Sequence, residues 1–205
     1  MSESKAKGTT RFMIDIETTG VRPGEDDILE IGILEVEYGP EGLWVPGSAY
    51  QTYVYSDKQP VSEFAVKHMA EVYKAANETP KKTVAEVRGD ILNFLKDRGC
   101  EGYNVVFMGK NASGFDLPMM HAAGFLVPPG YVTTPEGKDV RVGDHHYSIY
   151  ELTGAVNLAC DVLGLPRKDV EAAAMGGATG GKHRAIGDCY DQLKLLNGLI
   201  KLMRK

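Results

Sequence analysis

The sequence predicts an α/β domain in which helices cover a sheet, and three observations support this fold class. Strand-like segments rich in apolar and β-branched residues dominate the first 56 residues. From residue 62 onward, apolar residues recur at the spacing of a helix. A compact apolar segment at 103–111 predicts one further strand among the helices. This order of elements is typical of a layered α/β domain.

The first part of the chain predicts a three-stranded antiparallel meander. Segments suited to strands are separated by short stretches at 20–27 and 39–47 that are rich in Gly and Pro. Short connections favour antiparallel pairing, because parallel strands need a long crossover. The strands are expected at residues 11–17, 28–38 and 48–56.

Helical spacing then dominates, with Ser62 as a candidate N-cap. Helices are expected at residues 62–77, 83–99, 116–126, 150–165 and 182–205. A Pro/Gly-rich loop at 127–144 and a flexible glycine segment at 172–181 separate some of them. Because no linker is evident, we expect one domain over residues 11–205, preceded by a flexible tail at 1–10.

Composition narrows the functional classes. The formal net charge of −5 argues against a broad basic surface for duplex DNA, although bound metal would allow a nucleic-acid substrate. The three cysteines are widely spaced and odd in number, which favours reduced thiols and a cytoplasmic location. The chain has no apolar run of membrane-spanning length, so we expect no membrane association.

Two acids stand on the first predicted strand. Because strand side chains have a period of two, Asp15 and Glu17 share one face with Met13. Like charges held together raise each other's pKa unless a cation lies between them, and hard cations such as Mg²⁺ or Mn²⁺ prefer carboxylate oxygens. Taken alone, two acids on a strand are more typical of a solvent-facing surface.

Further acids change this interpretation. Asp116 follows the strand predicted at 103–111, and Asp188 lies near the start of the last predicted helix. Acids at the ends of several elements can converge on two metal ions, which clamp the attacking and leaving oxygens of a phosphoryl displacement. His183 precedes Asp188 by five residues, and its unperturbed pKa suits proton transfer near neutral pH.

Three segments together resemble a known family. "DIETTGVRPGEDDILEIGILEVE" resembles the first motif of the DEDD 3′→5′ exonucleases, "NASGFD" is similar to their second, and "HRAIGD" to the third motif of the histidine-bearing DEDDh branch. The motifs follow the family's order across residues 11–198. The resemblance implies a ribonuclease H-like three-layer fold, in which a mixed sheet is flanked by helices.

The resemblance also implies roles for individual residues. Asp15, Glu17 and Asp188 correspond to ligands of a first metal ion, and Asp15 would bridge to a second ion supported by Asp116. His183 corresponds to the general base. The implied cofactors are two Mg²⁺ or Mn²⁺ ions.

Four further residues are implied to bind substrate. The backbone around Thr18 and Thr19 would meet the terminal nucleotide, and Val21 falls where the family often has an apolar wedge under the last base. His68 weakly matches a histidine-containing helix that flanks the pocket in some members. The expected substrate is nucleic acid with a free 3′ end, single-stranded rather than duplex, and the products are nucleoside 5′-monophosphates. A homodimer is left open.

Departures from the family pattern keep two alternatives open. Asn111 and Asp116 are five residues apart, as in oligoribonucleases, yet 141–152 lacks the "YRxLDVST"-like run of those enzymes. A nanoRNase that acts only on very short RNA is therefore one alternative, and the choice between RNA and DNA is open. A non-catalytic nucleic-acid or polymerase-binding module of the same fold is the other.

The other histidines and the glycine segment favour structural roles. We expect His145 and His146 on a loop surface, since adjacent residues point in different directions. His121 is expected at helix surface or core edge. The glycines at 176–181 lack the Gly-Lys-Ser/Thr ending of a P-loop, so they predict a loop.

Overall fold

The computed structural model describes residues 9–59, 63–176 and 183–204. Most of the expected tail at 1–10, the candidate cap Ser62 and the glycines at 177–182 lie outside the described residues. Thr10, which was assigned to the tail, already opens the first strand.

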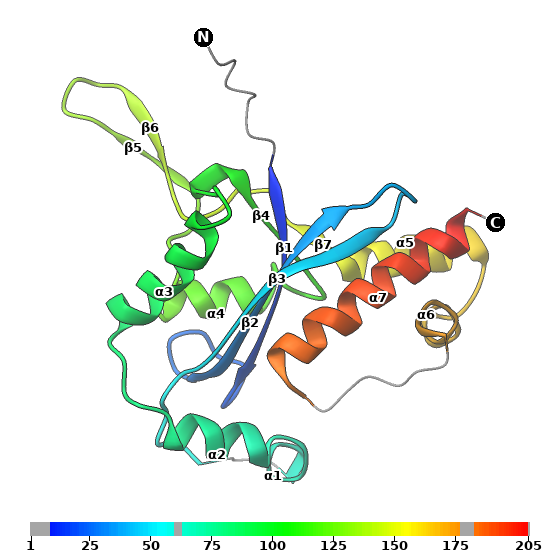
Figure 1. Cartoon of the computed structure of the whole chain (residues 1–205), viewed down its shortest axis with the longest axis horizontal. Helices are drawn as coiled ribbons and strands as arrows, with labels where there is room; N and C mark the ends of the chain where they lie inside the picture. The colour runs from blue at the N-terminus through cyan, green and yellow to red at the C-terminus, as the bar shows by residue number, and fades with distance from the viewer. Residues whose placement is uncertain (1–8, 60–62, 177–182, 205) are drawn as a thin grey trace.

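Five strands form one mixed sheet in the order β3-β2-β1-β4-β7 (Figure 1). The strands are β1 (Thr10–Thr18), β2 (Ile28–Tyr38), β3 (Trp44–Tyr53), β4 (Val105–Gly109) and β7 (Tyr150–Glu151). The first three strands pair antiparallel, which confirms the predicted meander, whereas β4 and β7 run parallel to β1. The sheet therefore has the mixed character that the resemblance implied.

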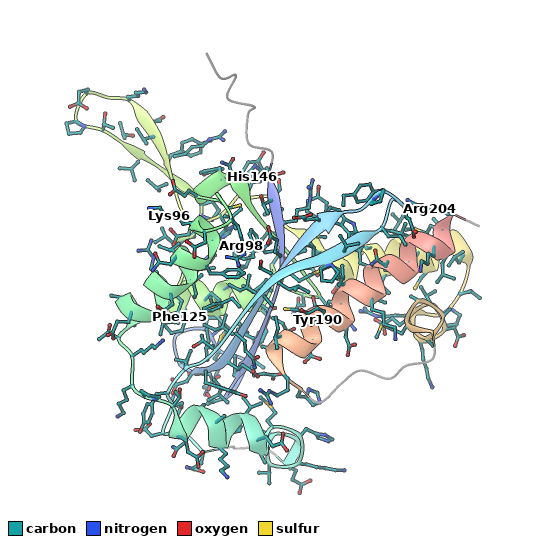
Figure 2. All side chains as sticks on the ribbon, in the orientation of Figure 1. Lys96, Arg98, Phe125, His146, Tyr190 and Arg204 are labelled. Atoms are coloured by element: carbon teal, nitrogen blue, oxygen red, sulfur yellow. The ribbon has the colours of Figure 1, made fainter. Side chains whose placement is uncertain are left out.

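Helices cover both faces of this sheet. The helices are α1 (Glu63–His68), α2 (Ala70–Glu78), α3 (Val84–Lys96), α4 (Asp116–Ala122), α5 (Leu152–Leu163), α6 (Arg167–Met175) and α7 (Ala185–Met203). Figure 1 shows α3 and α4 on one side and α7 on the other, with α1 and α2 at one end of the sheet. Side chains fill the space between these layers (Figure 2). This arrangement confirms the three-layer, ribonuclease H-like fold.

The period of two along β1 explains the layers. Phe12, Ile14 and Ile16 enter the core shared with α3 and α4. Met13 faces the opposite way and packs with Cys189 of α7. The strand is therefore buried on both faces along most of its length, which is typical of a central strand.

Element boundaries differ from the prediction most clearly at Met69 and at Trp44. The helix expected at 62–77 is divided at Met69, whose backbone is not helical and whose side chain packs into a small core with Leu29. Strand β3 begins at Trp44, inside the turn expected at 39–47. The Asn197 side chain accepts from the Trp44 N–H at 2.8 Å and donates to its carbonyl at 2.7 Å, which satisfies this edge backbone.

Four strands and helices were missed, namely β5 (Gly130–Thr133), β6 (Asp139–Val142), β7 and α6. The loop expected at 127–144 contains a two-stranded hairpin of β5 and β6. Residues 172–175 of the expected glycine segment belong to α6, and β7 precedes α5. The hairpin is mostly exposed and α6 is exposed over much of its surface, so neither leaves a long apolar repeat in the sequence.

Among the described residues, none of the helices combines the length and apolar character needed to cross a bilayer.

Gly32 lets the start of α7 lie directly on β2. A Cβ atom at Gly32 would lie 2.5 Å from the carbonyl carbon of Ala185 and 2.5 Å from the nitrogen of Ile186. These neighbours are backbone atoms, which cannot rotate away. Because Gly32 is the cross-strand partner of Asp15, this close approach brings α7 beside the acidic end of β1.

Replacing Gly32 by alanine should therefore push α7 off the sheet. We expect Gly32→Ala to lower the free energy of unfolding by about 1–3 kcal/mol, as measured by urea denaturation. The matched control is Gly89→Ala in α3, where a Cβ would meet no atom within 4 Å. This control should raise stability by about 0.5–1 kcal/mol, the usual gain at a helix interior. Equal denaturation midpoints for Gly32→Ala and the parent would contradict the close packing.

Candidate active site

The end of β1 presents two acids to α7. Asp15 and Glu17 lie opposite Gly32 and Glu30 of β2, and they follow Met13 on the face that packs against α7. The predicted shared face is therefore observed. The β1–β2 register shifts directly after Glu17, so the regular ladder ends at the second acid.

The first turn of α7 brings the third acid. Asp188 shares a hydrogen bond with Glu17. Oxygen atoms of Glu17 and Asp188 and a ring nitrogen of His183 all lie within 4.8 Å of one another. Glu17 of β1 and two residues at the start of α7 thus offer three donor atoms close enough to share one metal ion.

Asp116 reaches the site from the opposite side of β1. It is the first residue of α4, and its Oδ1 accepts a hydrogen bond from the Ile16 N–H at 3.0 Å. Strand β4 pairs with β1 only as far as Met13, so the Ile16 N–H has no ladder partner on that side. The short parallel strand therefore leaves a gap in the ladder that Asp116 fills.

The turn before α4 is held by Glu151. Its carboxylate accepts from the Asn111 N–H at 2.5 Å, and from the Ser113 N–H at 3.2 Å and hydroxyl at 2.9 Å. Asn111 has a φ of 65°, a left-handed conformation that asparagine tolerates better than most residues. The longer spacing between Asn111 and Asp116 is thus accommodated in a defined turn.

The surroundings raise the pKa of all four carboxyl groups. Burial raises the pKa of Asp15 well above its usual range, and the charges of Asp116 and Asp188 raise it further. Burial and the charge of Asp188 raise the pKa of Glu17 to about 8. Burial raises the pKa of Asp116 to about 7, although the hydrogen bond from Ile16 opposes this, and burial also raises that of Asp188. The cluster therefore disfavours its own ionisation.

This donor set fits divalent metal ions. Carboxylate oxygens are the ligands that Mg²⁺ and Mn²⁺ prefer, and a bound cation would favour the ionised form of these buried acids. The guanidinium of Arg184 lies nearby, but it is ion-paired with Glu30 at 3.3 Å. Within the part of the chain that the structure describes, no lysine or arginine forms an ion pair with Asp15, Glu17, Asp116 or Asp188.

Glu30 is a site residue that the sequence analysis missed. It is fully buried and accepts hydrogen bonds from the Arg184 side chain and from the Ala185 N–H at 3.2 Å. Arg184 also donates to the Tyr53 hydroxyl. Glu30 thereby fixes the start of α7 between His183 and Asp188. The signal was present, since an acid within the apolar run "ILEIGIL" needs a buried partner.

Gln192 is a second residue that was missed. It is buried on α7, and its Nε2 donates to Asp15 Oδ1 at 2.7 Å. Its Oε1 accepts from the Lys110 N–H at 2.9 Å. Gln192 lies four residues after Asp188, so both side chains share one face of the helix, and that spacing was the available signal.

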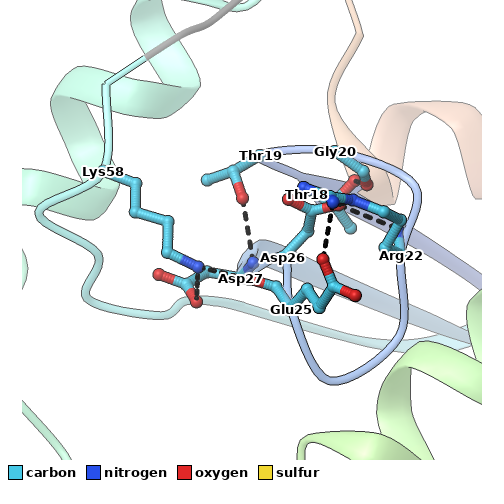
Figure 3. A network of polar contacts seen from close by, with 8 residues as sticks. All are labelled: Thr18, Thr19, Gly20, Arg22, Glu25, Asp26, Asp27 and Lys58. Atoms are coloured by element: carbon cyan, nitrogen blue, oxygen red, sulfur yellow. Dashed lines mark hydrogen bonds and ion pairs between the residues drawn. The ribbon is translucent and has the colours of Figure 1, made fainter.

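The end of β1 and the loop after it carry three of the residues expected to bind substrate, of which Thr18 and Thr19 are drawn in Figure 3. Thr19 is buried, its N–H donates to the Asp27 carbonyl at 2.9 Å, and its hydroxyl accepts from the Asp27 N–H at 2.9 Å. These groups of Thr19 therefore hold the two ends of the loop together. Thr18 donates its hydroxyl to the Gly20 carbonyl at 2.5 Å, whereas Val21 is 75% exposed.

The loop is anchored at its far end by Lys58. The ammonium of Lys58 contacts the Asp27 carboxylate at 2.8 Å and the Glu25 carbonyl at 2.6 Å (Figure 3). Arg22 adds ion pairs to Glu25 and Asp26 within the loop. Val21 is thus an exposed apolar side chain on a loop held by internal bonds.

His68 lies beside the acidic cluster. Its ring is 5.6 Å from the ring of His183, and the two rings meet edge to face. The structure therefore brings together all five residues with expected catalytic roles, namely Asp15, Glu17, Asp116, His183 and Asp188, with His68 at the edge of the group.

The remaining histidines lie elsewhere. His145 is 1% exposed, so its predicted place on a loop surface is wrong. It is buried because its Nδ1 bonds to the His146 carbonyl at 2.7 Å and its ring stacks on His121, with an Nε2–Nε2 distance of 3.0 Å. His146, labelled in Figure 2, donates its N–H to the carbonyl of Val105, the first residue of β4. Val105 pairs with Thr10, so this bond lies at the end of β1 opposite to the acids.

Comparisons with known proteins agree with this geometry. The chain resembles E. coli exonuclease I bound to single-stranded DNA and zinc, with 16% identity and a TM-score of 0.62, over 97% of this chain and 41% of that one. It also resembles a 3′-exonuclease that recognises the 3′ end of a histone mRNA stem-loop, with 14% identity and a TM-score of 0.60, over 98% of this chain and 67% of that one. At these identities the likeness shows the fold, and the chain spans less than half the length of exonuclease I.

No curated protein sequence matches the chain significantly. A family model described as "Exonuclease", of the RNase T type, matches residues 12–125, more than half of the chain. That segment contains Asp15, Glu17 and Asp116. The chain therefore belongs to the RNase T family of DEDDh 3′–5′ exonucleases, which act on nucleic acids.

Proposed function

We propose that the chain removes nucleotides one at a time from the 3′ end of single-stranded nucleic acid and releases nucleoside 5′-monophosphates. The observation that carries this proposal is the convergence of four carboxyl groups, from β1, α4 and α7, with His183 beside them. A non-catalytic binding module has no need to gather acids that raise one another's pKa. The family membership and the DNA- and RNA-bound relatives support nucleic acid as the substrate.

The carboxylates would hold two Mg²⁺ or Mn²⁺ ions. Asp15, Glu17 and Asp188 would bind the first, and Asp15 and Asp116 the second. These ions supply positive charge that stabilises the attacking and leaving oxygens of the phosphodiester. A relative in this fold, E. coli exonuclease I, has been seen with bound zinc.

His183 would accept the proton of the attacking water. Its ring nitrogen is within 4.8 Å of oxygens of Glu17 and Asp188, so a water molecule activated beside those acids lies within its reach. Glu30 holds the adjacent Arg184 and Ala185, which limits the movement of His183 on its C-terminal side. The same distances also suit a metal ligand, so the two roles need to be separated by experiment.

Digestion of 5′-labelled single strands tests the activity. We expect a ladder that shortens from the 3′ end in Mg²⁺ or Mn²⁺, and no cleavage in EDTA. Matched DNA and RNA strands, each as a length series from two nucleotides upward, will give the sugar preference and separate the nanoRNase alternative. A circular single strand is the control and should survive. Cleavage of the circle, or full activity without metal, would refute the proposal.

Replacing His183 separates a base from a ligand. A base moves a proton and does not hold the ion, so His183→Ala should reduce turnover by about 10²–10⁴-fold while Mn²⁺ affinity stays near that of the parent. Asp188→Ala should lose turnover and Mn²⁺ binding together. Isothermal titration with Mn²⁺ and single-turnover rates are the measurements. Loss of Mn²⁺ affinity in His183→Ala would assign the ring as a ligand instead.

The raised pKa values predict how stability varies with pH when metal is removed. Glu17 holds its proton up to a pKa of about 8 in the folded chain, against an ordinary value of 4.5. Its contribution to stability is therefore complete below about pH 4.5 and is lost as the pH rises through 8. Asp116, with a pKa of about 7, acts in the same direction. We expect the Tm of the EDTA-treated protein to fall between pH 5 and 8.

Two controls accompany this measurement. Mn²⁺ should restore the Tm most strongly at pH 8, where the ionised carboxylates bind it. Glu17→Gln mimics the protonated acid, so it should flatten the pH dependence and weaken the stabilisation by Mn²⁺. A Tm independent of both pH and Mn²⁺ in the parent would show that the acids are not a coupled cluster.

A further inference from the structure

We infer that Gln192 is a positioning residue of the metal site, which sets the direction in which the Asp15 carboxylate faces the ions. The inference rests on the proposed metal site and adds a residue outside its five catalytic positions. Gln192 contacts one expected ligand directly and is joined to the segment that carries another.

The orientation of the Gln192 amide is fixed by its partners. The backbone N–H of Lys110 can only donate, so the atom facing it is Oε1, at 2.9 Å. The other end of the amide is therefore Nε2, which donates to Asp15 Oδ1 at 2.7 Å. Since both oxygens of a carboxylate are joined to one carbon, holding Oδ1 also sets the direction of Oδ2.

The backbone around Lys110 is shaped to admit this amide. Gly109 ends β4, and a Cβ there would lie 2.7 Å from the Ala112 side chain, 3.0 Å from the Ile14 carbonyl and 3.4 Å from Gln192 Oε1. A larger residue at 109 would separate β4 from β1 and from the amide. The glycine therefore permits the close approach of three segments at one point.

Gln192 joins the elements that carry the separate ligands. It stands on α7, as Asp188 does, and it binds Asp15 of β1. Its second bond holds Lys110, at the start of the turn that Glu151 fixes and that leads to Asp116. A movement of any one of these segments would strain the amide. Partners that orient ligands in this way are commonly worth 10–100-fold in metal affinity, an order of magnitude that applies here.

The chain offers a matched control on the same helix. Asn197 also bridges α7 to a strand with both ends of its amide, which bond to the Trp44 N–H at 2.8 Å and carbonyl at 2.7 Å. It contacts none of the acids in these bonds. Gln192→Leu and Asn197→Leu should therefore cause comparable losses of Tm, because each removes two hydrogen bonds to partly buried polar groups.

The experiment measures Mn²⁺ binding to the full-length, metal-free protein by isothermal titration. Gln192→Leu should bind Mn²⁺ about 10–100-fold more weakly than the parent, while Asn197→Leu should bind it with unchanged affinity. In nuclease assays, excess Mn²⁺ should recover much of the lost rate in Gln192→Leu. Gln192→Met, which keeps the side chain's length, replaces the leucine variant if that variant does not fold.

The outcomes distinguish this inference from the proposed function. Parent-like Mn²⁺ affinity in Gln192→Leu, or an equal loss in both variants, would overturn the positioning role and leave the metal site intact. If the parent itself does not bind Mn²⁺, the proposed metal site is wrong and the inference falls with it.

Discussion

The structure depends on holding the start of α7 directly against β1 and β2. Asp188 reaches Glu17 only because Gly32 has no side chain to separate the helix from the sheet. Glu30 then binds the Arg184 side chain and the Ala185 N–H, which fixes the first turn of α7 at that place. Apolar packing in the following turns of α7 also stabilises the helix on the sheet, since Cys189 and Leu193 pack with Met13.

This anchoring opposes a strong electrostatic penalty. The same approach that completes the site places carboxyl groups together in a partly buried region. Burial raises their pKa values, and for Asp15 and Glu17 the charges of neighbouring acids raise them further. Apolar burial beside the site offsets this penalty, since Phe12, Ile14 and Ile16 are buried between the sheet and two helices. An acidic cluster that is unfavourable without a cation is well suited to bind one, since binding relieves the repulsion.

Neighbouring amide and carboxylate side chains position the segments that carry the catalytic acids. Glu151 holds the turn before Asp116, and Gln192 spans the gap between that turn and Asp15. Each satisfies backbone N–H groups that the short strand β4 leaves unpaired. The chain shares its fold with exonuclease I at only 16% identity.

The sequence by itself determined the meander, most of the helices and the residues of the acidic cluster. Alternation along β1 is a local property, so it placed Asp15 and Glu17 on one face before any packing was known. Tertiary structure alone decided which distant groups meet, as with Gln192 and Lys110, or Glu30 and Ala185. It also decided that His145 is buried and that the exposed hairpin of β5 and β6 forms strands. These features depend on contacts between segments far apart in the chain, and local patterns of hydrophobicity carry no record of such contacts.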